Sequence, residues 1–407
     1  MNSIKKTFLI LSVLMIITGC TKDDYDEGGV PLIPDNNRVW YELVSRDTLK
    51  STDILKTLIG SPMVSVGPPL VRQSFLYHSI NKSDTVTLSG VVCWPEGYDS
   101  CNEIWLENHY FTIRWNECPS QEPQAGMLCG SIRHAVYIGA DYQGQGLTRE
   151  MYQPFSNTIL LANQSIDCFK AAYSVLQDYG PKLADDYYTY SMGSSLGGAV
   201  TFGIARQIEL DPGLKELVRL KKSFCCGGPY DMKALFDVFL ETPDEELMYP
   251  VGFICSVKGI MDDSPAFRKY SYSDCFTPEL LNIGIMDSIE TKLFDAPQLN
   301  HMLKDAGFKS IRDILSDSIR NNNSALHKDL IQELAGLDLT VGWSPSSPIL
   351  LRHVRTDLNI PFRCLESVQA NMPDNGNITY EIIESGNHTD DCVAFYKKLI
   401  FGQYPLD

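Results

Sequence analysis

Short apolar segments alternate along the chain with longer segments of helical spacing. β-Branched, aromatic and apolar residues dominate five segments, which predicts strands at 86–93, 104–106, 135–142, 187–192 and 223–226. In 166–176 apolar residues recur three or four positions apart, which predicts a helix, and 196–208 predicts a second one. Because strands and helices alternate, we expect an α/β fold with a mostly parallel, doubly wound sheet.

The alternation stops between 230 and 339, where the pattern is helical and loop-rich. Helices are predicted there at 232–240, 278–285 and 311–319. Strand-like segments return at 348–353 and 378–383, and a last helix is expected at 392–401. We therefore expect a sheet domain in two parts, 41–229 and 340–407, with 230–339 inserted as a helical cap.

The N-terminus has the pattern of an export signal. Lys5 and Lys6 precede an apolar run at 8–17, which is too short to span a bilayer, so 1–19 is predicted to be a signal peptide. Cys20 follows Gly19 in a segment that resembles a bacterial lipobox; an ordinary signal peptide that happens to hold a cysteine is the alternative. The polar segment 20–40 then reads as a flexible tether. Its acidic start resembles a surface-export signal of Bacteroidetes lipoproteins, so we expect a lipid anchor at Cys20 in the bacterial outer membrane, facing outward.

Charge and cysteine content limit the partners. The net charge of −17 repels phosphate backbones, which argues against nucleic-acid binding. No second long apolar run is present, so membrane contact is expected through the lipid alone. Of the 12 cysteines, Cys93 with Cys101 and Cys118 with Cys129 are close enough in sequence to be candidate disulfides. No paired CxxC motif occurs, so neither a metal nor a cofactor is expected. The sequence does not indicate an oligomeric state.

The clearest chemical motif is G-x-S-x-G at 193–197, with Ser195 at its centre. A predicted strand precedes it and a predicted helix follows, as in the nucleophile turn of serine hydrolases. Gly193 and Gly197 are expected because side chains there would collide with the neighbouring chain. The alternative is a Ser/Gly turn that only packs a helix on a sheet.

A serine nucleophile needs a base and an acid, in the chain order Ser, Asp, His. His388 lies just after the last predicted strand, and Asp357 follows the strand before it, so we assign them as base and orienting acid. Glu384 and Asp390 are rival acids, but each lies too near His388 in sequence to reach its far nitrogen. His301 and His327 fall in the helical insertion and are expected to be exposed, whereas His353 ends a strand and is expected to be structural, with a place in the site wall as the alternative.

Two backbone N–H groups should stabilise the oxyanion. The first is that of Leu196, directly after the nucleophile, and the second should come from the loop after an early strand. In that loop Tyr110 is our choice, with Phe111 next to it. His109, at the start of this loop, is equally consistent with a functional role and with a hydrogen-bonded histidine buried in the core.

These residues resemble the secretory lipase family, related to lipase A of the yeast Candida antarctica, and Bacteroidetes lipoprotein esterases. The resemblance runs from about residue 70 to the C-terminus. It includes the 140–146 loop, which is similar to the family's DYxGxG segment, the turn at 193–197, the acid segment at 352–362 and the segment at 386–388. It implies an α/β-hydrolase fold, catalytic roles for Ser195, Asp357 and His388, and a cap at 230–339 over the acyl pocket.

We therefore expect a carboxylic ester hydrolase that acts on small acyl esters rather than triglycerides, because the cap lacks a continuous apolar lid helix. A serine exopeptidase with the same triad is the first alternative, with Asp244, Glu245 or Glu246 of the cap as possible captors of a peptide N-terminus. The second alternative is a non-catalytic surface protein that binds glycans or proteins on a hydrolase scaffold.

Overall fold

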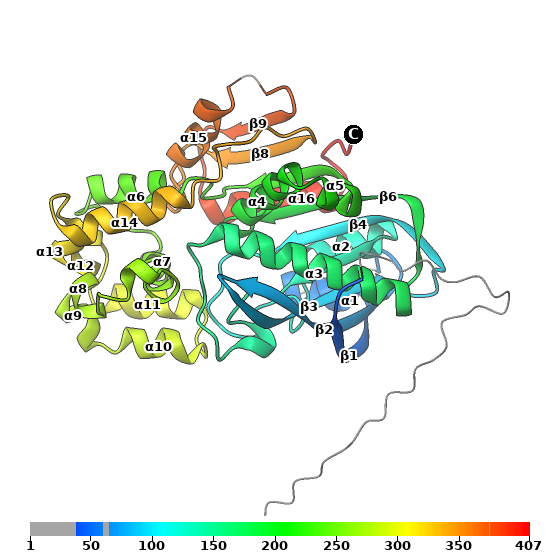
Figure 1. Cartoon of the computed structure of the whole chain (residues 1–407), viewed down its shortest axis with the longest axis horizontal. Coiled ribbons are helices and arrows are strands. Elements are labelled where there is room, and N and C mark those ends of the chain that lie inside the picture. The colour runs from blue at the N-terminus through cyan, green and yellow to red at the C-terminus, as the bar shows by residue number, and fades with distance from the viewer. Residues whose placement is uncertain (1–37, 60–64, 374) are drawn as a thin grey trace, which may run out of the picture. The chain divides into compact units, whose positions relative to one another are not determined.

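A computed structural model describes residues 38–59, 65–373 and 375–407. Within these residues the strands form one nine-stranded sheet, in the order β1-β2-β3-β5-β4-β6-β7-β8-β9 (Figure 1). The strands are β1 (Tyr41–Leu49), β2 (Leu70–Asn81), β3 (Asp84–Pro95), β4 (Ser100–Asn108), β5 (Val136–Ala140), β6 (Lys182–Ser194), β7 (Leu220–Cys226), β8 (Ile349–Val354) and β9 (Ile378–Ile383).

The second half of the sheet is parallel, so the carboxyl ends of its strands and the loops that follow them lie at one edge. β1, β2, β3 and β5 pair antiparallel, whereas β5, β4, β6, β7, β8 and β9 pair parallel. Asn108 at the end of β4 lies opposite Gly193, Ser194 lies opposite Cys226, and Cys226 lies opposite Arg352. The loops after these strands therefore meet at one edge, where ligands bind in open α/β sheets.

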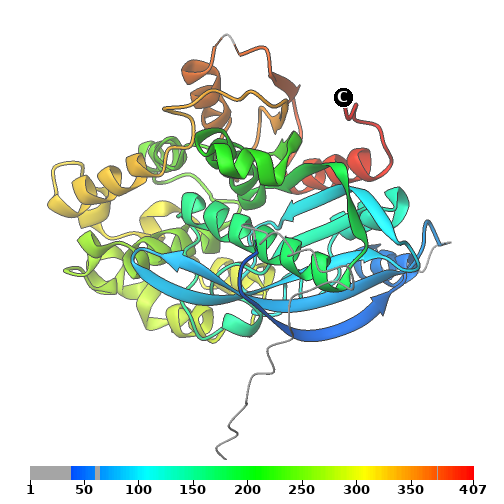
Figure 2. The ribbon, with the colours of Figure 1, turned by 45° about the vertical axis from the view of Figure 1, so that its right-hand side comes forward.

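Helices cover both faces of the sheet because successive strand side chains point to opposite sides. In β4, Ile104 and Leu106 pack in the core under α3 and α4, whereas Trp105 packs on the other face with α1, α2 and α16. Figure 2 shows α3 lying along the long strands β2 and β3. The helices around the sheet are α1 (Ser51–Ile59), α2 (Gly126–Arg133), η1 (Gly146–Thr148), α3 (Thr158–Tyr179), α4 (Leu196–Leu210), α5 (Pro212–Val218), α15 (Arg363–Asn371) and α16 (His388–Ile400).

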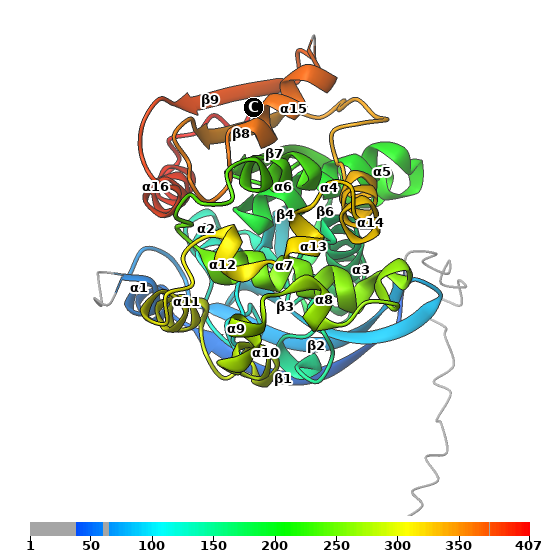
Figure 3. The same cartoon turned by 90° about the vertical axis from the view of Figure 1, so that its left-hand side faces the viewer.

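Between β7 and β8 the chain is helical and builds a hydrophobic core of its own. Phe236, Ile254 and Leu299 are among the buried residues of this core, which is distinct from the two cores against the sheet. Figure 3 shows these helices together, in green to yellow. They are α6 (Met232–Glu241), α7 (Pro250–Asp263), η2 (Pro265–Phe267), α8 (Tyr272–Cys275), α9 (Pro278–Asn282), α10 (Ile285–Thr291), α11 (Ala296–Asp305), α12 (Ile311–Ile314), α13 (Asp317–Arg320) and α14 (Ala325–Gly336).

The predicted α/β fold class is confirmed, and several element boundaries differ. β1 and β2 were not predicted, and the helix expected at 278–285 is two helices, α9 and α10. Gly284 separates them at φ 69°, a left-handed conformation that ends one helix and begins the next. The helix expected at 311–319 is likewise divided, because Leu315 is extended and the hydroxyl of Ser316 caps α13.

The two candidate disulfides do not form. All eleven cysteines in the described residues are free thiols. Cys93 lies on β3 and Cys101 on β4, and β5 lies between these strands in the sheet, which keeps the two thiols apart. Cys118 and Cys129 are each buried, the second inside α2. Proximity in sequence therefore gave a wrong pairing.

The predicted signal peptide, Cys20 and all but the last residues of the tether lie outside the described residues. None of the helices that the structure describes combines the length and the hydropathy needed to cross a membrane.

Candidate active site

Ser195 occupies a sharp turn between β6 and α4. Its backbone has φ 55° and ψ −128°, a conformation that residues other than glycine rarely adopt. Its N–H donates a hydrogen bond to the carbonyl oxygen of Cys226 at 2.8 Å, which ties the turn to the end of β7. A strained residue held by its surroundings is typical of an active site, and here it presents a serine at the N-terminus of a helix.

The two glycines of the motif are required by space. A Cβ at Gly193 would lie 2.2 Å from the carbonyl oxygen of Gly197, and a Cβ at Gly197 would lie 2.0 Å from that of Asn108. Both contacts are with backbone, so no side-chain movement relieves them. The turn at 193–197 is thus packed against the end of β4 as closely as the sequence analysis expected.

Asp357 and His388 form a hydrogen-bonded pair beside this turn. The Nδ1–H of His388 donates to Oδ2 of Asp357 at 2.6 Å. The N–H groups of Asn359 and Ile360 donate to the other carboxylate oxygen, at 2.8 and 3.0 Å. These contacts fix the carboxylate in place, and they leave Nε2 of His388 as the nitrogen free to accept a proton.

The pKa shifts of Asp357 and His388 are those expected of an ionised acid that orients a histidine base. Burial acts to raise the pKa of Asp357, but its hydrogen bond with His388 and the charge of that ring hold it below the usual value. Burial acts to lower the pKa of His388, and hydrogen bonds with Asp357 and Cys392 outweigh it, so the pKa is raised. Asp357 therefore stays ionised and stabilises the imidazolium form of His388.

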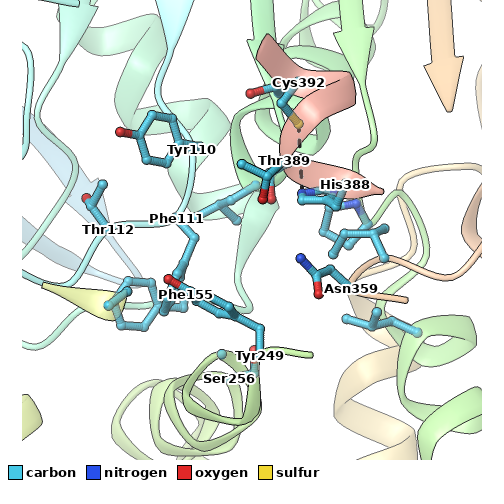
Figure 4. Close-up of a pocket in the computed structure, with 18 of the residues that line it drawn as sticks. Tyr110, Phe111, Thr112, Phe155, Tyr249, Ser256, Asn359, His388, Thr389 and Cys392 are labelled. Atoms are coloured by element: carbon cyan, nitrogen blue, oxygen red, sulfur yellow. Dashed lines mark hydrogen bonds between the residues drawn. The ribbon is translucent and has the colours of Figure 1, made fainter. Parts of the chain in front are cut away.

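The free nitrogen of His388 faces a thiol that the sequence analysis missed. Sγ of Cys392 lies 3.9 Å from Nε2 of His388, as the dashed line in Figure 4 marks. Ser195 and His388 line the same cavity, but no hydrogen bond joins them within the part of the chain described. The structure thus brings the predicted Ser195, His388 and Asp357 into one site. The hydrogen bond between His388 and Asp357 is formed, and the one between Ser195 and His388 is not. Catalytic hydrogen bonds are often loose in an unliganded enzyme.

Both proposed oxyanion donors belong to residues that line the same cavity as Ser195. Leu196 is the first residue of α4, so its N–H has no partner within the helix. Tyr110 follows β4 and lines the cavity. The ring of His109 is buried, and its Nδ1–H donates to the carbonyl oxygen of Tyr110 at 2.8 Å, which holds this segment in shape. His109 thus acts in the structure as a buried support.

Asp141, in the loop similar to the DYxGxG segment, ties surrounding loops together. Its carboxylate is fully buried and accepts hydrogen bonds from the Ser89 hydroxyl at 2.6 Å and from the Ser120 N–H at 2.8 Å. Gly146 in the same loop has φ 56°, and a Cβ there would lie 2.4 Å from Oδ2 of Asp141. The loop is therefore a structural support next to the site.

The remaining candidates have other roles. Glu384 pairs with Arg355 at 2.9 Å, and the carboxylate of Asp390 accepts from the Asn387 side chain at 2.6 Å, so neither rival acid contacts His388. Nε2 of the buried His353 lies 2.9 Å from the carbonyl oxygen of Ile360. No group of three or more His, Cys, Asp or Glu side chains is arranged for a metal ion in residues 38–59, 65–373 and 375–407.

The serine opens into a cavity of about 510 Å³ between the sheet domain and the helical segment. Its walls are mostly apolar and aromatic, and the polar exceptions include Glu117, Ser256 and Asn359. Figure 4 shows aromatic rings from both sides of this space. The aromatic lining residues are Tyr110, Phe111, Phe155, Tyr249, Phe253 and Tyr396. Such a cavity fits an apolar small molecule with few hydrogen-bonding groups.

Solved structures with the same fold include proteins from Xanthomonas oryzae, Legionella pneumophila and Candida antarctica. The chain is similar to a mutant of a rice cell wall degrading esterase, LipA, from Xanthomonas oryzae, with 18% identity, a TM-score of 0.70, and 91% of this chain and 98% of that one covered. A protein named as a hydrolase from Legionella pneumophila has 15% identity, a TM-score of 0.70, and coverage of 89% and 97%. Lipase A of Candida antarctica in its closed state has 13% identity, a TM-score of 0.62, and coverage of 89% and 83%.

No protein-family model and no curated protein matches the sequence. At these identities the structural matches establish the fold. The chain has the α/β-hydrolase fold, in the form found in Candida antarctica lipase A, as the sequence resemblance implied.

Proposed function

We propose that the chain is a serine hydrolase that cleaves small carboxylic esters. The observation that carries this proposal is that a strained Ser195 and the hydrogen-bonded Asp357–His388 pair open into one apolar cavity. Esters with apolar acyl groups match that cavity, and the structural neighbours include an esterase and a lipase by name. The volume of the cavity favours small esters over triglycerides.

The proposed reaction proceeds through an acyl-enzyme on Ser195. Oγ of Ser195 attacks the acyl carbon, and Nε2 of His388 accepts the hydroxyl proton and passes it to the leaving alkoxide. Asp357 stabilises the imidazolium in between. Water then attacks the acyl-enzyme with the same base. In this proposal the N–H groups of Leu196 and Tyr110 donate to the oxyanion, and the loss of one such donor typically costs about 3 kcal/mol of transition-state stabilisation.

The peptide alternative has less support. Asp244 forms an ion pair with Arg312, and Glu246 lies 3.6 Å from Lys304, both on exposed surface. Neither these acids nor Glu245 line the cavity. An exopeptidase that captures an amino terminus through them would need a different site.

Replacing the nucleophile tests the proposal. We expect Ser195→Ala to lower kcat on p-nitrophenyl butyrate at least about 10⁴-fold, because the acyl-enzyme cannot form. Ser83→Ala, at an exposed turn between β2 and β3, is the control and should keep wild-type activity. Undiminished turnover by Ser195→Ala would exclude this serine. Faster cleavage of aminoacyl-p-nitroanilides than of esters would favour the exopeptidase.

We also propose that the protein is anchored through Cys20 in the bacterial outer membrane, facing outward. The proposal rests on the apolar run at 8–17 and the lipobox-like residues before Cys20. Cells fed radioactive palmitate should label the wild-type chain and not Cys20→Ala. A labelled Cys20→Ala chain would refute the anchor at this position.

A further inference from the structure

Cys392 differs from every other cysteine in the described residues. The other ten are buried, whereas Cys392 is half-buried and lines the cavity next to His388. Reagents small enough to enter the cavity can therefore reach this thiol.

The position of Cys392 follows from where α16 begins. The helix starts at His388, so residues 388 and 392 lie one turn apart on the same face. This places Sγ of Cys392 3.9 Å from Nε2 of His388. Cys226 at the end of β7 is a hydrogen-bonding neighbour of Cys392, and its thiol also lies 3.5 Å from Oδ2 of Asp391. The thiol thus sits among an imidazole, a second thiol and the open cavity.

These neighbours change the acidity of the thiol. Hydrogen bonding with Cys226 lowers the pKa of Cys392, and so does hydrogen bonding with His388. Burial acts in the opposite direction but is outweighed. Burial raises the pKa of Cys226, and likewise that of Cys101 to about 11. Because the thiolate is the nucleophilic form of cysteine, Cys392 is the reactive thiol of this set.

We propose that Cys392 is a covalent modification site for low-molecular-weight disulfides that enter the cavity. The Cys392 thiolate attacks one sulfur of the disulfide, a new S–S bond forms to the enzyme, and the S–S bond of the reagent breaks. The departing thiolate takes a proton from the His388 imidazolium or from water. Cys226 can next attack Sγ of Cys392, which releases the second half of the reagent as a thiol and leaves a Cys226–Cys392 disulfide.

Modification stops hydrolysis and reduction restores it. A group on Sγ of Cys392 occupies the space in front of Nε2 of His388, where the proton of Ser195 must arrive. This consequence rests on the proposed function, whereas the modification itself does not. The two are measured separately, by mass and by turnover.

The experiment treats the full-length chain with hydroxyethyl disulfide, a small uncharged reagent, and maps its peptides by mass spectrometry without reduction. We expect the Cys392 peptide to carry the hydroxyethylthio group or to be linked to the Cys226 peptide. Turnover of p-nitrophenyl butyrate should fall in step with this product and return with dithiothreitol. An unmodified Cys392 peptide, or label confined to other cysteines, overturns the proposal.

Variants separate the chemistry from folding. Cys392→Ala and Cys392→Ser should resist inactivation by the reagent, each judged against its own untreated activity. Cys101→Ala, which removes a buried thiol elsewhere, should be modified at Cys392 as the wild type is. Ser195→Ala should also be modified at Cys392, so a failure of the esterase assignment does not obscure the result.

The pH dependence of labelling tests the His388 contact. The titratable groups facing Cys392 are His388 and Tyr396 on its own helix and Cys226 on β7, with the Asp391–Arg352 ion pair behind Cys226. Of these, His388 contacts the thiol and carries a positive charge when it is protonated. His388→Ala should therefore slow labelling at pH 6 about tenfold or more, with less effect at pH 9. An equal rate in both proteins at pH 6 contradicts the proposed activation.

Discussion

The backbone of Ser195 shows how single residues determine this site. Its positive φ is maintained by a hydrogen bond to Cys226 and by close packing of the turn, in which a Cβ at either flanking glycine would clash with backbone. The motif could be identified from sequence because the glycines have a steric cause. The contact of Cys392 with His388 was missed because the last helix was expected to begin at 392. With a start at 388, the spacing of four residues would have placed both side chains on one face.

A prediction at this scale concerns the acid limb of the pH–activity profile. Hydrolysis needs neutral His388, and its pKa is raised by hydrogen bonds with Asp357 and Cys392. Cys392→Ala removes one of the anionic partners, so the pKa of His388 should fall and the neutral base should appear at lower pH. We expect the acid limb of kcat/KM for p-nitrophenyl butyrate to move to lower pH. Asp357→Asn is the comparison, because it should lower kcat at all pH values. An unchanged limb in Cys392→Ala would mean that the thiol does not influence the base.

At the scale of elements, most strands with apolar runs were predictable, whereas β1, the largely buried β2 and the boundaries set by caps were not. β3, β5, β7 and β8 each contain a run of buried, mostly apolar residues, and β9 has Ile or Tyr at four of its six positions; such segments identify strands from sequence alone. β1 is exposed along most of its length and pairs only with β2, so its sequence carries little apolar signal. The start of α16 depends on the Asn387 side chain, which accepts from the Asp390 N–H. Such a cap is one local contact among many polar residues, and hydrophobic spacing does not reveal it.

Strand β4 provides a prediction about stability. Glu107 near its end is buried, and burial raises its pKa to about 7. A raised carboxyl pKa means that the native state holds a proton that the unfolded chain has lost, so the native state loses stability as pH rises from about 4.5 through 7. Glu107→Gln carries no charge and should escape this loss. The free energy of unfolding of Glu107→Gln minus that of the wild type should therefore increase by about 2–3 kcal/mol from pH 5 to pH 8.

Urea denaturation at both pH values measures this difference. Glu384→Gln is a suitable control, because Glu384 is exposed and paired with Arg355. The same wild-type-to-variant difference at pH 5 and pH 8 for Glu107→Gln would show that the carboxyl does not titrate in this range.

At the scale of the whole described fold, the sheet supplies the reacting groups and the helical segment supplies much of the cavity wall. Phe253 of α7, Tyr249 directly before α7 and Ala296 of α11 line the same cavity as Ser195 and His388. The sequence indicated a helical insertion, but it could not show which side chains face the serine. That depends on how many short helices pack around one another, and α8, α12 and α13 are each only four residues long.

Gly252 on α7 offers a test of acyl-chain preference. It lines the cavity, and a Cβ there would meet only Tyr249, at 3.7 Å, an ordinary contact. Gly252→Leu should therefore fold and fill part of the cavity. We expect kcat/KM for p-nitrophenyl octanoate to fall about tenfold relative to that for the acetate.

Gly336→Leu, in α14 on the same helical segment, is the matched control. A Cβ at this exposed glycine meets nothing within 4 Å, and the residue is away from the cavity, so the octanoate-to-acetate ratio should not change. An unchanged ratio in Gly252→Leu as well would show that the acyl chain lies elsewhere.

The separate hydrophobic core of the segment between β7 and β8 bears on how such an enzyme can diversify. Because Phe236, Ile254 and Leu299 are buried mainly among their own helices, mutations there are absorbed locally and leave the strands beneath Ser195 undisturbed. Selection can thus change the side chains that line the cavity, and with them the substrate range, while Ser195, Asp357 and His388 keep their positions. Substrate range should drift faster among descendants of this protein than the chemistry does.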